Sequence, residues 1–173
     1  TGLSFDAWTY GVHTTPADAY RFAQGDTLMM PPLDDAGQGT RPVALDRPLD
    51  FAAVTDHAEM FGEIYGCTTE GTLIYDSEMC QAYRAGGQDS VVAFGILLSD
   101  TNPKPVEELC GGDFDCAAAA QGVWEATVQA ADAANDAGEG CGFVAFPAYE
   151  YSGTPNASNF HRNVIFRNSQ VPT

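Results

Sequence analysis

Basic residues are scarce in this sequence: seven Lys and Arg stand against 24 Asp and Glu, and the formal net charge is −17 at pH 7. Proteins that bind nucleic acids or anionic membranes use Lys and Arg to contact phosphate groups. The composition therefore argues against both kinds of partner. Long hydrophobic runs are absent too, since no stretch of 18 apolar residues occurs. The sequence accordingly predicts no membrane-spanning segment.

Cysteine motifs of the Cys-x-x-Cys type are also absent, which argues against a zinc ribbon or a thioredoxin-like site. The five cysteines nevertheless fit an oxidising, extracytoplasmic compartment, either periplasmic or extracellular. Cys67 with Cys80, and Cys110 with Cys116, are close in sequence and lie in Gly-rich or polar surroundings. We predict two disulfides between them, although sequence alone leaves the connectivity open. Cys141 would then be either buried and free beside a core strand or paired outside this chain.

The composition is that of a folded, soluble domain. Hydrophobic residues make up 45% of the 173 residues, and there are ten Phe and seven Tyr. A chain of this length and hydrophobicity buries a sizeable core instead of remaining disordered. Strand-like and helical segments follow one another along it, and this order predicts an α/β fold with a largely parallel sheet.

Local patterns predict the individual elements. Thr15 and Pro16 are typical of an N-cap and a first helical residue, and Gly25 would end that helix. A long helix is expected over residues 115–135, where apolar residues recur at helical spacing. We also expect a surface connection over residues 29–48, a short helix over 77–84, and either a strand or a buried helix over 91–98.

The stretch that organises the rest of the chain is residues 49–59. Residues 51–55 are rich in strand formers and small residues, as expected of a strand buried on both faces. Asp56 and His57 would follow at its carboxyl end, where α/β proteins gather ligands and catalytic groups. The alternative is that Asp56 caps a turn and His57 is an ordinary histidine.

Two further apolar runs are associated with metal-binding residue types. Residues 141–150 form a strand-like run that ends in Glu150, and residues 159–167 place His161 immediately ahead of a third run. Asp6 adds an acid near the N-terminus, where a turn carboxylate is the alternative. Imidazole and carboxylate ligands in this combination suit Zn, Mn or Fe better than calcium. The four candidate metal ligands are Asp6, His57, Glu150 and His161.

Four motifs occur in order along the chain: Ser-Phe-Asp-Ala at 4–7, Arg-Pro-Leu-Asp-Phe at 47–51 running into Val-Thr-Asp-His-Ala-Glu at 54–59, Tyr-Glu-Tyr-Ser at 149–152, and Asn-Phe-His-Arg-Asn-Val-Ile-Phe-Arg at 159–167. In this order they resemble the opening third of a large bacterial family of unknown function. That family is similar to the polymerase and histidinol phosphatase (PHP) superfamily of metal-dependent phosphoesterases. The resemblance covers nearly the whole chain and is weakest between about residues 62 and 116.

The resemblance implies a partial, distorted βα barrel with largely parallel strands and flanking helices. Residues 1–173 would be a single N-terminal segment of a larger PHP-like domain. Members of the superfamily open with a strand carrying His-x-His followed by Thr, and Thr1 falls where that threonine would be. Because a partial barrel exposes a sheet edge, we expect the remainder of the parent chain or a second copy to cover that edge.

The resemblance also implies a role for each candidate ligand. Glu150 would bridge two metal ions, because a carboxylate offers two oxygens. His57 and His161 would be terminal nitrogen ligands. Asp6 would either bind the metal itself or contact one of the residues that bind it. Counting these ligands, we expect residues 1–173 alone to bind divalent metal weakly and to hydrolyse a generic phosphoester slowly.

The implied activity is that of a metal-dependent hydrolase of the phosphoesterase type, acting on a small anionic or phosphorylated substrate. Asp56 would orient His57 or a nearby backbone amide. Arg162 would hold the phosphate, or would alternatively form a salt bridge. The competing hypothesis is a non-catalytic extracellular structural or binding module that keeps the fold with an incomplete metal site.

Overall fold

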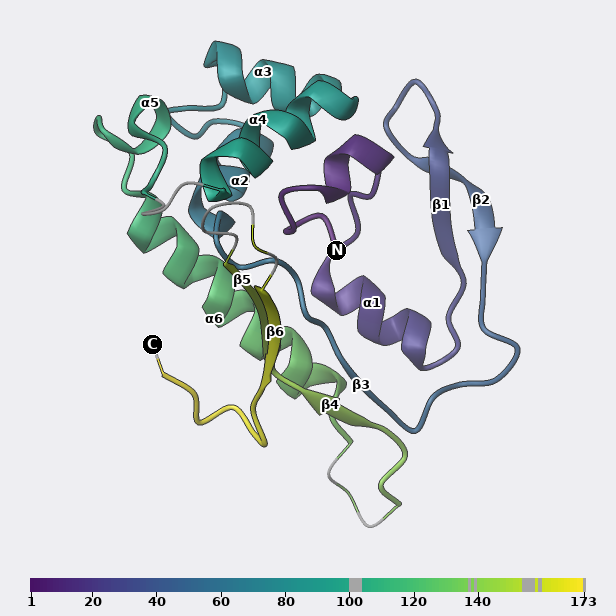
Figure 1. The fold of residues 1–173 in the computed structure, drawn as a ribbon. Helices are drawn as coiled ribbons and strands as arrows, with labels where there is room; N and C mark the ends of the chain where they lie inside the picture. The colour runs from purple at the N-terminus through teal and green to yellow at the C-terminus, as the bar shows by residue number, and fades with distance from the viewer. Residues whose placement is uncertain (100–103, 137, 139, 154–157, 159, 173) are drawn as a thin grey trace.

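The computed structural model describes residues 1–173 except 100–103, 137, 139, 154–157, 159 and 173. The described residues form a mixed α/β fold with six α-helices, one short 3-10 helix and three two-stranded sheets (Figure 1). The helices are η1 (Ala7–Tyr10), α1 (Pro16–Ala23), α2 (Phe61–Thr68), α3 (Glu78–Ala85), α4 (Gln88–Leu98), α5 (Glu107–Cys110) and α6 (Cys116–Ala134). The strands are β1 (Leu28–Leu33), β2 (Gly39–Val43), β3 (Phe51–Ala53), β4 (Val144–Phe146), β5 (Ala148–Gly153) and β6 (Phe160–Ile165).

The helices begin where local sequence predicts them. At α1 the Thr15 hydroxyl accepts the Asp18 N–H at 3.2 Å, and the Asp18 carboxylate accepts the Thr15 N–H at 2.8 Å. This reciprocal capping satisfies two backbone donors that the first turn leaves free. The side chain of Asp115 caps α6 in a related way, by accepting the Ala118 N–H at 2.9 Å. The predicted helices at 77–84 and 115–135 are confirmed, and the open alternative at 91–98 is resolved as a helix.

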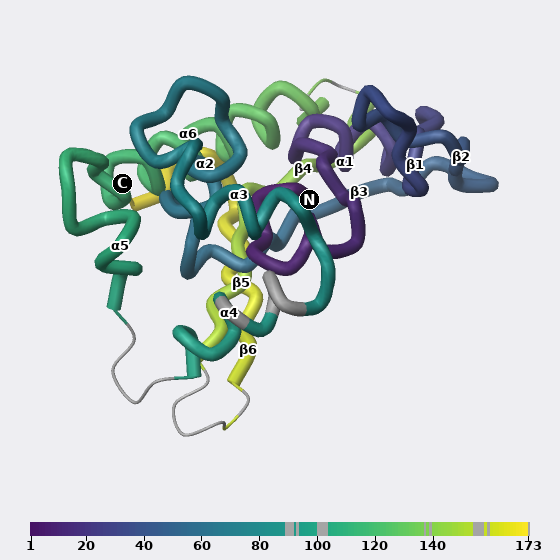
Figure 2. The backbone as a smooth tube through the Cα atoms, turned by 90° about the horizontal axis from the view of Figure 1, so that it is seen from above, coloured from purple at the N-terminus to yellow at the C-terminus, as the bar shows by residue number. Residues whose placement is uncertain are grey.

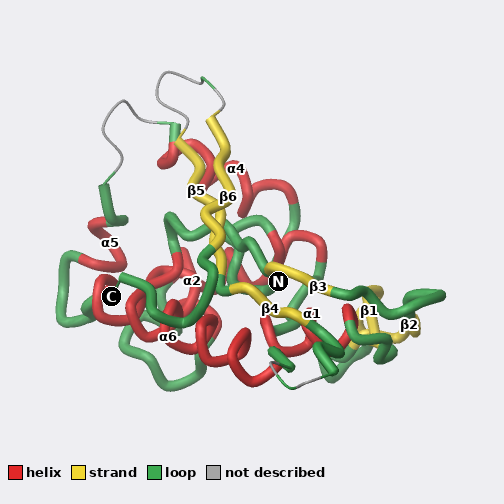
Figure 3. The backbone as a smooth tube through the Cα atoms, turned by 90° about the horizontal axis from the view of Figure 1, so that it is seen from below, coloured by secondary structure: helices red, strands yellow, loops and turns green. Residues whose placement is uncertain are grey.

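The sheets differ from the prediction. Only β3 and β4 pair in parallel among the described strands, whereas β1–β2 and β5–β6 are antiparallel, so the prediction of largely parallel strands is wrong. No closed or curled sheet occurs in the described part of the chain. The run at 141–150 was expected to be one strand, but the buried Pro147 divides it into β4 and β5. Proline has no N–H to donate to a ladder, and the chain continues beyond it into a different sheet (Figure 3).

Two of the predicted chain segments also need correction. Residues 29–48 are not only a surface connection, because they include most of the β1–β2 hairpin, which stands to one side of the molecule (Figure 2). Proline is tolerated there because both strands of a two-stranded sheet are edges. The strand predicted at 51–55 ends at Ala53 and is not buried on both faces, since Phe51 is 65% exposed.

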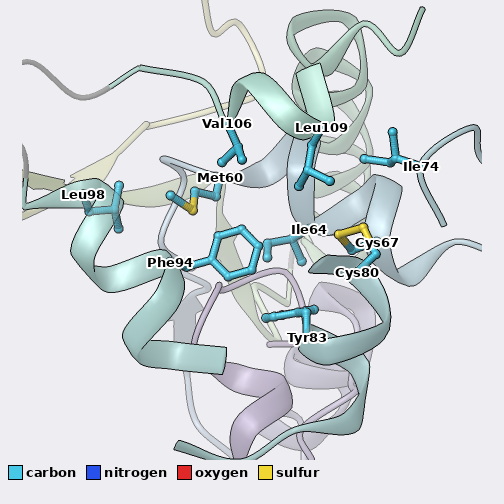
Figure 4. Packing of buried hydrophobic residues seen from close by; sticks show 10 residues of the cluster. All are labelled: Met60, Ile64, Cys67, Ile74, Cys80, Tyr83, Phe94, Leu98, Val106 and Leu109. Atoms are coloured by element: carbon cyan, nitrogen blue, oxygen red, sulfur yellow. A yellow bond between two sulfur atoms is a disulfide. The ribbon is translucent and has the colours of Figure 1, made fainter. Parts of the chain in front are cut away.

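The hydrophobic core consists of two clusters. The larger one fills the space among α2, α3, α4 and α5, where Phe94 lies beside Met60, Ile64 and Tyr83 (Figure 4). Its buried members are Met60, Ile64, Cys67, Ile74, Cys80, Tyr83, Phe94, Leu98, Val106 and Leu109. The smaller one packs α1 and α6 against β3 and β4, and contains Tyr20, Ala23, Val54, Ala131, Phe143 and Ala145. His57 and Glu59 come after β3 and before α2, so they lie in the segment that joins Val54 of the smaller cluster to Met60 of the larger one.

Both predicted disulfides are present, Cys67–Cys80 and Cys110–Cys116. The expectation that a free Cys141 is buried is wrong, because this residue is exposed. Titration of the denatured, non-reduced protein with a thiol reagent is therefore expected to find about one free thiol. Five reactive thiols in freshly isolated protein would contradict the disulfides and the oxidising compartment that they favour.

Within the described residues, no helix combines the length and the apolar character that crossing a bilayer requires.

Candidate metal site

The β5–β6 ribbon places three polar side chains on one face. In the antiparallel register Ser152 lies directly opposite His161. Glu150 precedes Ser152 by two residues and therefore projects from the same face of β5. The predicted position of His161 ahead of a strand needs correction, since this residue lies inside β6. Likewise Glu150 lies inside β5 and not at the end of a strand.

Backbone hydrogen bonds bring His57 to this face. The Glu150 N–H donates to the Asp56 carbonyl at 2.8 Å, and the Ala58 N–H donates to the Glu150 carbonyl at 3.0 Å. These two bonds form an isolated parallel bridge that aligns His57 with Glu150. These bonds hold the chain that follows β3 against β5, and they place the imidazole of His57 near Glu150.

The side chains of His57, Glu150 and His161 converge in this structure. One ligand atom from each lies within 4.8 Å of the others. The His161 Nδ1 is 2.7 Å from the Glu150 Oε1, and the two imidazole rings are 5.6 Å apart between centroids. His57 and Glu150 are 18% and 21% exposed at the side chain, and His161 is 44% exposed. The group is thus partly accessible to solvent, chiefly at His161, and its role as a metal site stays a prediction.

The Ser152 hydroxyl lies among these three groups. Its oxygen is 2.8 Å from the Nδ1 of His57 and 2.8 Å from the Nδ1 of His161. A serine nucleophile of the triad type needs a histidine that contacts the serine through one ring nitrogen and the acid through the other. Here His161 uses the same Nδ1 for Ser152 and for Glu150. This geometry does not support a proton relay to Ser152.

Asp56 is buried behind the site, with 4% of its surface exposed. Its carboxylate contacts the Thr1 backbone nitrogen and accepts hydrogen bonds from the Thr1 hydroxyl at 2.7 Å and the Ser4 hydroxyl at 3.0 Å. Ser4 in turn accepts the backbone N–H of His57 at 3.0 Å. Asp56 is therefore linked to the His57 amide through Ser4, and its role in orienting a metal ligand stays a prediction.

Asp6 is placed differently from the other predicted ligands. Among the described residues, the ligand atoms that gather around His57 do not include those of Asp6. Asp6 immediately precedes η1. The phenol of Tyr83 has a raised pKa, chiefly because it is buried and further because of the negative charge of Asp6. Asp6 thus lies toward the helical cluster, and its predicted role as a ligand remains untested.

Arg162 projects away from the candidate site. Successive side chains of a strand point to opposite faces, so Arg162 and His161 lie on opposite faces of β6. The Arg162 guanidinium lies 4.8 Å from the ring centroid of Phe160. This placement does not favour the predicted contact of Arg162 with a phosphate group at the candidate site.

Glu59 is a site residue that sequence reasoning did not identify. Its side chain is 11% exposed, its Oε1 accepts the Ser152 N–H, and its Oε2 is 3.8 Å from the His57 Nδ1. Burial raises the pKa of Glu59, the Ser152 N–H opposes this effect, and the nearby charge of Glu150 adds to it. The sequence also indicates Ser152, which we did not predict: it lies two residues after Glu150, and side chains two residues apart in a strand lie on the same face.

A cavity of about 430 Å³ adjoins the candidate site. Glu59 and Ser152 form the part of its wall that contacts His57, and apolar side chains including Met60, Leu98 and Tyr151 form much of the rest. Lys104, the only lysine in the sequence, also lines it. Cavities that bind small molecules have this size and this mixture of apolar walls with a few polar groups.

A second group of metal-binding residue types is formed by Glu63, Cys110 and Cys116. Both sulfur atoms belong to a disulfide, so neither thiolate is free to bind a metal. Burial raises the pKa of Glu63, whose Oε1 accepts the Val106 N–H at 3.4 Å. These contacts give the group a structural role between α2, α5 and α6.

Comparison with known proteins assigns a family. The chain belongs to the family described as "Protein of unknown function (DUF3604)", which matches residues 1–173. No curated protein and no solved structure matches the chain. The predicted membership of a family of unknown function is therefore confirmed, while the relation of that family to the PHP superfamily stays a prediction.

Proposed function

We propose that this member of the DUF3604 family is a metal-dependent hydrolase of the phosphoesterase type. The observation that carries the proposal is the convergence of His57, Glu150 and His161, whose ligand atoms lie within 4.8 Å of one another. Residues from three separate stretches of the chain supply two imidazoles and a carboxylate. This ligand set is suited to Zn, Mn or Fe.

The local geometry fits a divalent cation. Two atoms bound to one zinc ion at bond lengths of about 2.1 Å are separated by at most about 4.2 Å. The three ligand atoms lie within 4.8 Å of one another, and an inward rotation of the partly exposed His161 ring would bring them within this limit. A buried carboxylate oxygen without a hydrogen-bond partner, Glu59 Oε2, lies 3.8 Å from the Nδ1 of His57. Such an atom is satisfied by a cation more readily than by an apolar neighbour.

The protein's own residues would hold the ion and orient its ligands. His57, Glu150 and His161 would bind it, and the Asp56 and Ser4 hydrogen bonds fix the backbone of His57. A divalent cation supplies activation of water and stabilisation of the charge that develops on phosphoryl oxygens. Ser152, at 2.8 Å from each histidine, would orient these rings.

The substrate proposed for this site is a small anionic or phosphorylated molecule. The cavity of about 430 Å³ beside Glu59 and Ser152 offers the space for it. Lys104 lines that cavity and provides a positive charge in a chain whose net charge is −17. We therefore assign to Lys104 the contact with an anionic group that the sequence suggested for Arg162.

The proposed setting is extracytoplasmic, because the two disulfides persist in oxidising compartments. We also propose that the family is related to the PHP superfamily. The support for this relation is the order of the four motifs, three of which supply the converging residues His57, Glu150 and His161.

Metal loading of the natural, full-length protein tests the proposal. We expect elemental analysis after dialysis against Zn²⁺ or Mn²⁺ to find bound metal, and chelation to abolish hydrolysis of p-nitrophenyl phosphate. Readdition of the metal should restore the rate. Bound metal without turnover of any phosphoester would favour the non-catalytic module instead. Absence of bound metal would refute the proposed site.

A further inference from the structure

We propose that Glu59 is a further ligand of the metal ion and binds it through Oε2. This inference rests on the proposed function, because it concerns the same site. It adds a second carboxylate to the ligand set. The Glu59 oxygens are not among the ligand atoms that lie within 4.8 Å of one another, so this side chain would turn toward Glu150 and His161 to bind the same ion.

The first observation is an unsatisfied atom. Glu59 Oε2 is the one buried side-chain nitrogen or oxygen in the described part of the chain that has no hydrogen-bond partner. Buried carboxylate oxygens are normally paired, because leaving one unpaired costs the solvation that water supplied. The Nδ1 of His57, at 3.8 Å, is too distant to serve as a hydrogen-bond partner. An additional positive group at this position would satisfy the oxygen.

The second observation is the way the carboxylate is held. Its other oxygen, Oε1, accepts the backbone N–H of Ser152. The Ser152 hydroxyl in turn contacts both His57 and His161. Carboxylates that bind metal ions are themselves oriented by hydrogen bonds, and the Ser152 N–H would orient Glu59 in this way while Oε2 stays free to bind the ion.

The third observation is the distribution of charge. Glu59 and Glu150 are close enough for their negative charges to interact. Both side chains are largely buried, with 11% and 21% exposed, so water screens this repulsion poorly. The two carboxylates repel each other, whereas His57 attracts Glu59, and a cation bound between the carboxylates would offset their repulsion.

The test compares two glutamate-to-glutamine variants of the full-length protein. Glu59→Gln keeps the side-chain shape and an acceptor for the Ser152 N–H, but removes the negative charge. Glu63→Gln is the matched control, because Glu63 lies four residues further along in the first turn of α2, is buried and lines the same cavity. Zn²⁺ affinity is measured by competition with a chromophoric chelator, and the Co²⁺-loaded proteins are compared by visible absorption.

We expect Glu59→Gln to weaken Zn²⁺ binding at least about tenfold and to change the Co²⁺ spectrum, whereas Glu63→Gln leaves both as they were. The thermal unfolding midpoint of metal-free Glu59→Gln should be equal to or above that of the unsubstituted protein, because a largely buried negative charge close to that of Glu150 has been removed. A purely structural role for Glu59 predicts a lower midpoint and an unchanged spectrum. Glu59→Ala, measured alongside, should weaken binding to a similar extent.

The outcomes separate this inference from the proposed function. Metal affinity and a Co²⁺ spectrum unchanged in both Glu59 variants would overturn the inference and leave the metal site of His57, Glu150 and His161 intact. Failure of the unsubstituted protein to bind Zn²⁺ or Co²⁺ would overturn both. Binding without hydrolysis would leave Glu59 a ligand and remove the proposed activity.

Discussion

Replacing Glu150 by glutamine is expected to weaken divalent metal binding by about 100-fold or more and to remove metal-dependent phosphoester hydrolysis. Glu150 is the carboxylate that converges with the two imidazoles, with its Oε1 at 2.7 Å from the His161 Nδ1. Glutamine keeps the shape of the side chain but loses the charge that balances a divalent cation. Because changes to groups that merely support a metal ligand cost about 10–100-fold in affinity, loss of a charged ligand should cost at least as much.

The matched control is Glu125→Gln. Glu125 is exposed on α6, where its carboxylate accepts a hydrogen bond from Gln121 at 3.0 Å. This variant makes the same chemical change away from the site, so metal affinity and the hydrolysis rate should match those of the unsubstituted protein. Isothermal titration with Zn²⁺ and steady-state rates compare the two variants. A Glu150→Gln protein that binds and turns over normally would remove the residue on which the proposed function depends.

The second large effect concerns packing. Replacing Gly62 by alanine is expected to destabilise the fold by about 2–3 kcal/mol. A Cβ at this position would overlap the backbone carbonyl oxygen of Cys116 at the start of α6. The obstacle is main chain and cannot rotate away, so α2 and α6 would have to move apart. The helix-forming advantage of alanine over glycine, about 1 kcal/mol, offsets only part of this cost.

Gly122→Ala provides the control for this substitution. Gly122 lies in α6, is exposed, and has no atom within 4 Å of the position of an added Cβ. This substitution should therefore stabilise the protein by up to about 1 kcal/mol. Urea unfolding of both variants measures the two free-energy changes. If Gly62→Ala stabilised the protein as much as Gly122→Ala does, α2 and α6 would not be as closely packed as described.

The parts of the fold that sequence predicted are those determined within a few residues. The Thr15 and Asp18 capping contacts span three residues, and the disulfides join cysteines 13 and 6 residues apart. Strand pairing is different, because it depends on residues distant in sequence. The parallel pairing of β3 with β4 is compatible with the prediction. The antiparallel pairing of β5 with β6 could not be predicted, because neither strand's own sequence indicates its partner.

In the candidate site too, the features determined locally could be predicted, whereas those that depend on distant residues could not. The types of residue at His57, Glu150 and His161 indicated metal chemistry, and strand-like runs beside them indicated a buried setting. The burial of Glu59 could not be predicted, since it arises only when Ser152 of β5 is placed against the start of α2. Arg162 was selected because it follows His161, yet adjacency along a strand puts two side chains on opposite faces.

The bridge between His57 and Glu150 has a consequence for how the protein folds. The contact of His57 with Ser152 joins residues 95 positions apart, so forming it carries the entropic cost of closing a long loop, a cost that slows folding. A cation that needs all of these groups binds the native state and has no comparable site in the unfolded chain. Its binding then stabilises the native state by mass action, in proportion to the logarithm of its concentration. During refolding, the appearance of cobalt absorption would therefore report when this long-range contact forms.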